Sequence, residues 1–121
     1  MPLTAVLDAN VLIPNALCDL LLRLAEEELY VPRWSHLILD EVRRNLPMQP
    51  PDAVERRIAF MNAAFGDAMV RDFEQLIPAM TNDRKDRHVL AAAVAADADR
   101  ILTCNFVEAV RPHLPKADEP V

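Results

Sequence analysis

The stretch Leu3-Thr4-Ala5-Val6-Leu7-Asp8-Ala9-Asn10 decides the fold of this chain. Residues 3–7 form a short, mainly apolar run, which is typical of a buried strand in a parallel sheet. Asp8 closes the run, so its carboxylate is expected at the carboxyl end of the first strand. Ligands and catalytic groups gather at that edge in open α/β sheets. The opening residues therefore predict both an α/β sheet and a functional position.

Apolar periodicity and capping residues predict the elements that follow. We expect helices over 15–28, 35–45, 52–66, 68–76 and 83–97, and two further strands over 29–32 and 101–104. Ser35, Asp52 and Asp83 are the expected N-caps, and Gly66, the only glycine, is expected to end the helix that begins at Asp52. The order strand, helix, strand, several helices, strand favours an α/β sandwich with a small parallel sheet.

The size and composition of the chain indicate one compact domain. Its 121 residues suit a single domain spanning 1–121, and 52% hydrophobic residues suffice for a core. The chain ends where another strand could begin, so the sheet could lack its last edge strand. We find no apolar run long enough to cross a bilayer and no basic leader, so a cytoplasmic location is expected.

Several functional classes are disfavoured by the residues present. A single glycine cannot build a GxGxxG loop or a P-loop. Cys18 and Cys104 lie far apart in apolar surroundings, which predicts buried free thiols rather than a zinc site. The net charge of −6 argues against a simple basic nucleic-acid-binding module. It does not exclude a nucleic-acid enzyme whose metal ions supply positive charge.

Acidic residues recur at comparable points along the chain, namely Asp8, Glu41, Asp86 and Glu108. Each has an ordinary explanation, such as a turn or cap for Asp8, a solvated helix face for Glu41 and a loop for Glu108. If they converged on one crevice, they would form a site for a hard divalent metal.

Two acids stand at the start of the 83–97 helix, where either could cap backbone amides. We assign capping to Asp83 and the site to Asp86. Asp97 and Asp99, at the other end of that helix, are interpreted as solvated turn acids. Asn10 is expected to cap the first turn or to hold a carboxylate, and Thr103 and Asn105 to stabilise the turn after the third strand.

The remaining polar residues give weaker signals. His36, His88 and His113 share no metal-ligand spacing, so they are interpreted as surface or packing residues. Basic residues flank the acids, either on solvated helix faces or as contacts for a phosphate backbone: Arg33, Arg43, Arg44, Arg84, Lys85 and Arg87.

Taken together, four segments resemble the PIN domain family. They are Leu7-Asp8-Ala9-Asn10-Val11-Leu12, Leu39-Asp40-Glu41-Val42, Lys85-Asp86-Arg87-His88-Val89-Leu90-Ala91-Ala92-Ala93 and Ile101-Leu102-Thr103-Cys104-Asn105. The resemblance covers nearly the whole chain and is most specific from Lys85 to Ala93. It implies a three-layer α/β/α sandwich with the family's acid positions at Asp8, Glu41, Asp86 and Glu108. Relatives often carry Asp followed by Phe at the last position, whereas this chain has Glu108 followed by Ala109.

The resemblance also implies an activity. Many family members are metal-dependent ribonucleases that serve as toxins of toxin–antitoxin pairs. The expected enzyme is an endoribonuclease in which water activated by Mg²⁺ or Mn²⁺ hydrolyses RNA phosphodiester bonds. Asp8, Glu41 and Asp86 would be catalytic and metal-binding, Glu108 a further metal ligand, and Asn10, Thr103 and Asn105 supporting residues.

The resemblance implies an antitoxin and a second copy of the chain as partners. Leu17 or Leu21 could serve such a contact, although core packing is the expected role of each. Two alternatives to the ribonuclease stay open. One is a phosphohydrolase with Asp8 as nucleophile, which Asn10 disfavours because such enzymes usually carry a second Asp there. The other is a catalytically inactive module that binds a protein or RNA.

Overall fold

The structure, a computed structural model, describes residues 2–46, 49–103 and 107–109, with only the backbone described for 107–109. Its sheet has the order β2-β1-β3-β4. β1 (Leu3–Leu7), β2 (Tyr30–Arg33) and β3 (Arg100–Leu102) are parallel, and β4 (Val107–Ala109) runs antiparallel to β3. The strand that Asp8 follows, β1, therefore lies between two parallel neighbours.

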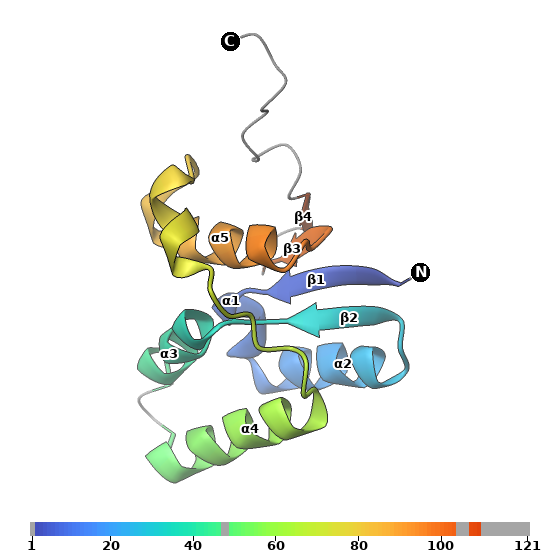
Figure 1. Cartoon of the computed structure of the whole chain (residues 1–121). Coiled ribbons are helices and arrows are strands. Elements are labelled where there is room, and N and C mark those ends of the chain that lie inside the picture. Colours follow the sequence, from blue (N-terminus) through green and yellow to red (C-terminus); the bar gives the residue numbers. More distant parts are fainter. Residues whose placement is uncertain (1, 47–48, 104–106, 110–121) are drawn as a thin grey trace, which may run out of the picture.

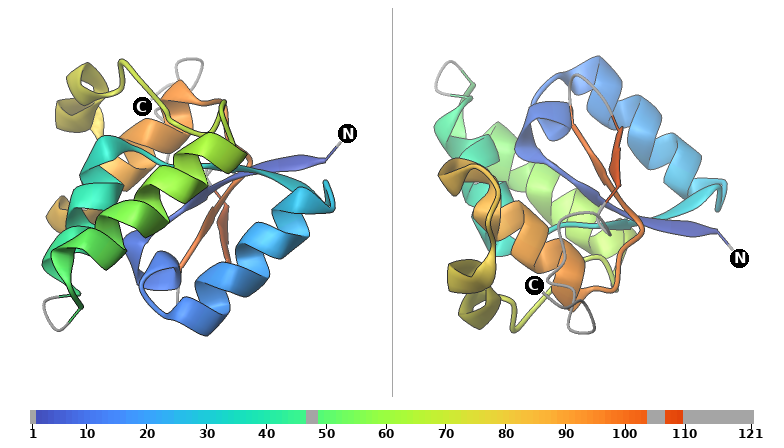
Figure 2. Two further views of the ribbon diagram at one scale, coloured as in Figure 1. Left: turned by 90° about the horizontal axis from the view of Figure 1, so that it is seen from below. Right: turned by 90° about the horizontal axis from the view of Figure 1, so that it is seen from above.

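Helices lie on both sides of this sheet. They are α1 (Ala9–Leu12), α2 (Asn15–Glu26), α3 (His36–Arg44), α4 (Pro51–Ala64) and α5 (Arg87–Ala95), with short 3₁₀ turns η1 (Glu74–Ala79) and η2 (Arg84–Asp86). In Figure 1, α5 lies above the strands and α2 and α4 lie below them. The views from below and above in Figure 2 place α4 and α5 on opposite sides of the strands. The expected α/β/α sandwich with a small parallel sheet is confirmed.

The core is built from the sheet and the helices that cover it. Val6 and Leu7 of β1 are fully buried. Ala91, Ala92 and Ala93 of α5 are also fully buried, and such small side chains let a helix approach a sheet closely. Cys18 is a buried free thiol, as predicted, whereas Cys104 lies outside the described residues. Leu17 and Leu21 are partly buried against the core, so their expected packing role is confirmed.

Trp34 anchors the segment that follows α4. Its backbone N–H donates to the carbonyl oxygen of Ala68 (2.9 Å), and its carbonyl oxygen accepts from Val70 N–H (2.8 Å). The predicted helix over 68–76 is therefore wrong, because its first residues are extended beside Trp34. Asp72 then adopts a left-handed φ of 59°, which a helix does not tolerate.

Of the N-caps predicted for α3 and α4, one is confirmed and one is wrong. Ser35 caps α3 as expected, because its Oγ accepts from Ile38 N–H (3.2 Å). Asp52 is not a cap but lies in the first turn of α4, which begins at Pro51. Proline fits a first helical position because its φ is fixed and its missing N–H would have no helical partner there. Gly66 lies beyond the last residue of α4, Ala64.

One more prediction is corrected beside α5, and Asp99 makes contacts that the sequence did not predict. Asp83 makes no capping hydrogen bond, and the chain passes through η2 before α5 begins at Arg87. Asp99 is exposed, as expected of a solvated turn acid, and it also makes two hydrogen bonds: its Oδ2 accepts from Thr4 N–H (3.0 Å), and its own N–H donates to the carbonyl oxygen of Thr4 (2.8 Å). These two hydrogen bonds attach the beginning of β1 to the loop before β3.

The far edge of the sheet also differs from expectation. The sequence predicted three strands, with Glu108 in a loop, whereas Glu108 lies in β4, opposite Ile101 of β3. No helix in the described part of the chain has both the length and the apolar character needed to cross a membrane.

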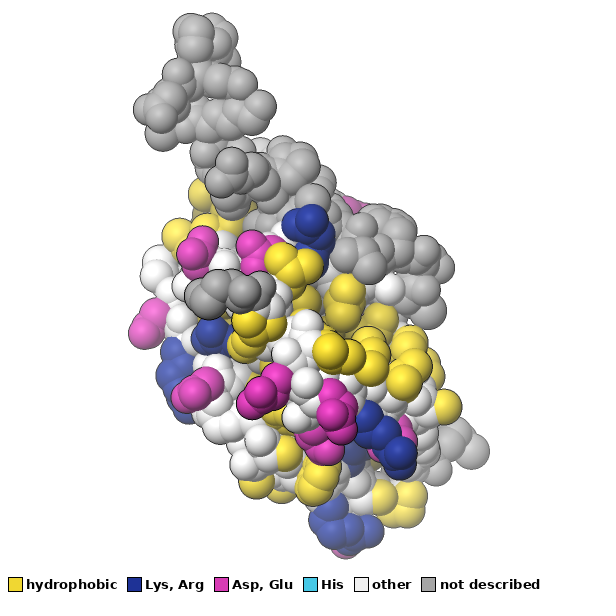
Figure 3. All heavy atoms as spheres, turned by 90° about the vertical axis from the view of Figure 1, so that its right-hand side faces the viewer, with side chains coloured by type: hydrophobic (Ala, Val, Ile, Leu, Met, Phe, Trp, Pro, Cys, Tyr) yellow, Lys and Arg dark blue, Asp and Glu magenta, His cyan; other side chains and the backbone are white. Residues whose placement is uncertain are grey.

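The surface carries exposed apolar side chains. Figure 3 shows hydrophobic side chains gathered beside acidic and basic ones on one face. The large exposed hydrophobic residues are Leu3, Leu20, Leu29, Val31 and Phe60.

Candidate active site

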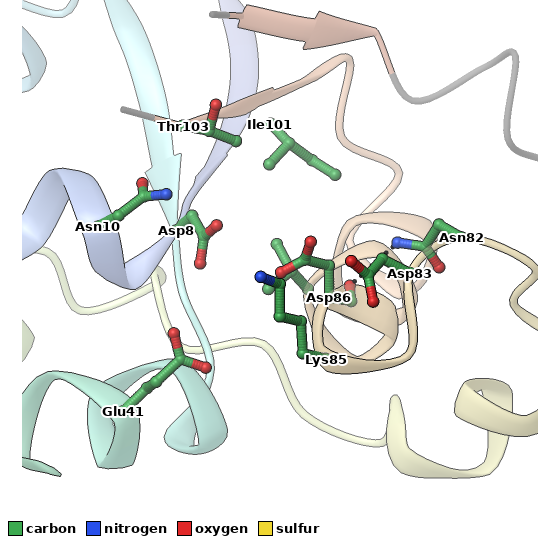
Figure 4. A pocket seen from close by; sticks show the side chains of 10 residues that line it. Asp8, Asn10, Glu41, Asn82, Asp83, Lys85, Asp86, Ile101 and Thr103 are labelled. Atoms are coloured by element: carbon green, nitrogen blue, oxygen red, sulfur yellow. Dashed lines mark hydrogen bonds between the residues drawn. The ribbon is translucent and has the colours of Figure 1, made fainter. Parts of the chain in front are cut away.

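A pocket of about 480 Å³ opens at the carboxyl end of β1 (Figure 4). Asp8, which follows β1, meets residues of α1, α3, η2, α5 and β3 there, although these segments are far apart in sequence. The pocket is lined by Asp8, Asn10, Glu41, Asn82, Asp83, Lys85, Asp86, Val89, Ile101 and Thr103. Three of the four acids predicted from the sequence have described side chains, and all three line this cavity: Asp8, Glu41 and Asp86.

Asp8 is fixed between the sheet and α1. Its backbone N–H donates to the carbonyl oxygen of Leu102 in β3 (3.1 Å). Its Oδ1 accepts from Ala9 N–H (2.7 Å), so Asp8 is the N-cap of α1. The capping role considered for Asn10 therefore belongs to Asp8. Only 7% of Asp8 is exposed, and this burial is unusual for a carboxylate.

Glu41 reaches the pocket from α3. Its Oε1 lies 3.3 Å from Nε2 of His88, which is on α5. His88 was expected to be a surface or packing residue, but it contacts a pocket acid directly. The neighbouring Asp40 points elsewhere, because it pairs with Arg43 (2.7 Å). The two adjacent acids of α3 therefore have different surroundings.

Asp86 belongs to the turn that leads into α5. Asn82 Nδ2 donates to the carbonyl oxygen of Asp86 (3.2 Å), and Arg87 Nε donates to the carbonyl oxygen of Asn82 (3.0 Å). Asp86 N–H also donates to the carbonyl oxygen of Asp83 (2.9 Å). These backbone contacts hold the turn while leaving the Asp86 carboxylate at the pocket.

The acids influence one another electrostatically. Burial raises the pKa of Asp8, the hydrogen bond from Ala9 opposes this change, and the charges of Glu41 and Asp86 add to the increase. Burial also raises the pKa of Asp86; Lys85 opposes the increase, and Asp83 and Glu41 add to it. A pocket in which neighbouring carboxylate charges raise the pKa of Asp8 and of Asp86 is one that a cation would stabilise.

The donor set suits a hard cation, but it does not form a compact cage. No group of three or more His, Cys, Asp or Glu side chains within the described ranges is arranged to hold a metal ion. Mg²⁺ does not require such a cage, because it keeps several waters and commonly binds proteins through one or two carboxylates. The carboxylate oxygens of the pocket therefore fit Mg²⁺ or Mn²⁺ in their chemistry.

The supporting residues are only partly described. Asn10 and Thr103 line the pocket beside the acids, and their supporting roles stay predictions. Asn105 lies outside the described residues, and so does the side chain of Glu108. The fourth acid expected from the sequence thus stays a prediction.

The structure adds Asn82, Asp83 and Lys85 to the pocket. Their closeness to Asp86 in the sequence could have identified them as site residues. Asp83 was not identified because it was assigned to a helix cap. The arginines are placed differently from Lys85. Arg43 pairs with Asp40 and Glu55, and Arg33 donates to the carbonyl oxygen of Ala68 (3.3 Å). Among the described residues, Lys85 is the basic side chain that lines the pocket.

Comparison with known proteins gives one match. A family model described as PIN domain matches residues 4–107. That range contains Asp8, Glu41 and Asp86, and it includes every described strand except the end of β4 and the first residue of β1. No curated protein and no solved structure matches the chain.

Proposed function

Because the chain belongs to the PIN domain family, we propose that it is a metal-dependent endoribonuclease that hydrolyses RNA phosphodiester bonds. One observation carries this proposal: Asp8, Glu41 and Asp86, from three separate segments, line a single pocket. The burial of Asp8 supports it, since an isolated buried carboxylate is costly and a cation would offset that cost.

Each acid has a proposed role. Asp8 and Asp86 would hold the principal Mg²⁺ or Mn²⁺, and Glu41 would complete the ligand set or orient the attacking water. When bound, the ion would offset the charge of the phosphate and lower the pKa of a water. Asn10 and Thr103 would orient neighbouring carboxylates, and Glu108 and Asn105 would contribute from the segment after β3.

Lys85 is the proposed contact for the substrate phosphate. It lines the pocket together with the acids, and its charge opposes the increase that burial causes in the pKa of Asp86. An ammonium group suits a phosphate as a compact point charge. Arg43 is less suited, because Asp40 and Glu55 already engage its guanidinium group (2.7 and 2.6 Å).

We further propose the biological setting that the family suggests. The chain would act in the cytoplasm as the toxin of a toxin–antitoxin pair, bind a cognate antitoxin and form a homodimer. The whole chain, residues 1–121, would be one domain. Family membership supports these statements.

RNA cleavage tests the proposed activity. Wild-type protein is expected to cleave RNA with Mn²⁺ and to stop when the metal is chelated, whereas Asp8→Asn is expected to be inactive. Cleavage that survives both changes would overturn the proposal. A phosphoryl group trapped on Asp8 would indicate the phosphohydrolase instead.

Two adjacent acids provide a matched control. Glu41→Gln changes a pocket acid, whereas Asp40→Asn changes its neighbour on α3, which pairs with Arg43 outside the pocket. We expect Glu41→Gln to lose cleavage and Asp40→Asn to keep it. Equal losses in two folded variants would indicate that the pocket has no special role.

A further inference from the structure

We propose that His88 is a positioning residue that holds the Glu41 carboxylate toward the pocket and thereby sets the affinity of the site for a divalent cation. The inference rests on the proposed function, since it assumes that Glu41 serves a metal site. It adds a residue from outside the lining of the pocket. His88 makes its contact from α5, across to α3.

The contact is sheltered and connects two helices. His88 Nε2 lies 3.3 Å from Glu41 Oε1, and the side chains are 16% and 32% exposed, respectively. A pair with this little exposure is less screened by solvent than a surface pair. The two residues are far apart in sequence, so their contact depends on the packing of α5 beside α3.

The chemistry of the pair fixes which ring nitrogen carries a proton. An ionised carboxylate oxygen only accepts hydrogen bonds, so the nitrogen that faces it must be the N–H donor. His88 therefore donates through Nε2. Its Nδ1 is buried and has no hydrogen-bond partner among the described residues. The contact with Glu41 therefore determines which nitrogen of the His88 ring carries the proton.

Glu41 needs such a donor because the other pocket acids repel it. Burial raises the pKa of Asp8 and of Asp86, and the charge of Glu41 adds to both increases, so the three carboxylates are close enough for like charges to interact. A glutamate has a long, flexible side chain and could turn away from them toward solvent. The hydrogen bond to Oε1 opposes that movement and leaves Oε2 for the pocket. Groups that hydrogen-bond a ligating carboxylate commonly change metal affinity by about 10–100-fold.

Two amide substitutions separate a positioned donor from a merely polar residue. The side-chain nitrogen of Gln can occupy the place of His Nε2. The side chain of Asn is shorter by one methylene group, so its nitrogen does not reach that place. We expect His88→Gln to bind Mn²⁺ nearly as well as wild type. His88→Asn is expected to bind it about 10–100-fold more weakly. Calorimetric Mn²⁺ titration measures both affinities, and thermal melting checks that each variant is folded.

A double-mutant cycle tests whether His88 acts through Glu41. In a Glu41→Ala background, His88→Asn should scarcely change Mn²⁺ affinity, because the group that it positions is absent. A metal-free measurement adds an independent readout. Nitrogen NMR of the His88 ring should show the proton on Nε2, and a ring protonated only on Nδ1 would overturn the proposal.

The outcomes distinguish this inference from the function on which it rests. If wild type binds Mn²⁺ and Asp8→Asn does not, while folded His88→Gln and His88→Asn bind alike, the positioning role is wrong and the metal site stands. Equal Mn²⁺ affinities of His88→Asn and wild type would have the same meaning. Wild-type protein that binds no Mn²⁺ would overturn both proposals.

Discussion

Asp8 caps α1 through Oδ1 and also lines the pocket with its carboxyl group. Asp8→Asn retains a side-chain oxygen that can accept from Ala9 N–H, so it should remain folded while losing about 10²-fold or more of its activity. Asp8→Ala removes the cap as well and should cost an additional ~1 kcal/mol of unfolding free energy. RNA cleavage and urea unfolding measure the two effects. An Asn variant less stable than the Ala variant would contradict this division of roles.

The raised pKa of Asp8 predicts a pH dependence of stability. The folded state holds the proton above the ordinary pKa of 3.8, so the stability contributed by Asp8 is present below that pH and is lost as pH rises through the folded pKa. Asp8→Asn has no such titration. In the presence of a chelator, its melting temperature should therefore rise relative to wild type as pH increases through this window. A constant difference between the two proteins would indicate that the burial of Asp8 has no such effect.

Lys85 should affect substrate binding more than the fold, because it is exposed and lines the pocket. We expect Lys85→Gln to raise KM for RNA and to reduce the slope of log affinity against log salt by about 1, as for one lost phosphate contact. Arg84→Gln is the matched control, since Arg84 is an exposed neighbour outside the pocket lining. RNA binding measured at several salt concentrations gives this slope. If Lys85→Gln and Arg84→Gln had the same slope, the prediction would be wrong.

At the scale of elements, α4 supports the short helix that Asp8 caps. Arg57 of α4 donates to the carbonyl oxygens of Leu12 and Ile13, at the end of α1. Arg57→Met should lose about 1–3 kcal/mol of unfolding free energy, because those part-buried carbonyls would lose a charged donor. Arg56→Met, at an exposed neighbouring position, should change stability little. Equal effects in urea unfolding would show that the link between α4 and α1 is dispensable.

An element could be predicted from the sequence when the interactions that define it are local in the chain. β1 and α3 were predictable because a continuous apolar run and a Ser35 cap are local signals. The segment over 68–76 was not, because Val70 and Phe73 are both buried at a helical spacing while the backbone of Val70 pairs with Trp34. That pairing depends on a residue more than thirty positions away, which no local pattern contains.

The residues of the candidate site also differ in how far local signals reveal them. Asp8, Glu41 and Asp86 could be selected because acids beside parallel strands and at a helix start converge at one edge of a sheet. Asp83 was wrongly assigned to a cap. An acid at a helix N-terminus is favourable whether it caps the helix or serves a site, so the sequence does not distinguish the two roles. His88 was missed because its contact with Glu41 arises only when α5 packs beside α3.

At the scale of the whole molecule, metal binding should stabilise the fold. A cation at 100 times its dissociation constant stabilises a protein by about 2.7 kcal/mol when only the folded state binds it. That free energy corresponds to an increase of several degrees in melting temperature for a domain of this size. Mn²⁺ should raise the melting temperature of wild type and not that of Asp8→Asn. No shift in wild type at millimolar Mn²⁺ would count against the site.

The attachment of β1 at both of its ends has a consequence for the pocket. Asp99 holds Thr4 at one end, and Leu102 accepts from Asp8 N–H at the other. Together they lock the register of β1 against β3. A slip by a single residue would present Leu7 or Ala9 where the carboxylate now stands and would turn alternate side chains to the opposite face. Asp99, although remote from the pocket, thus helps to determine which side chain stands at the carboxyl end of β1.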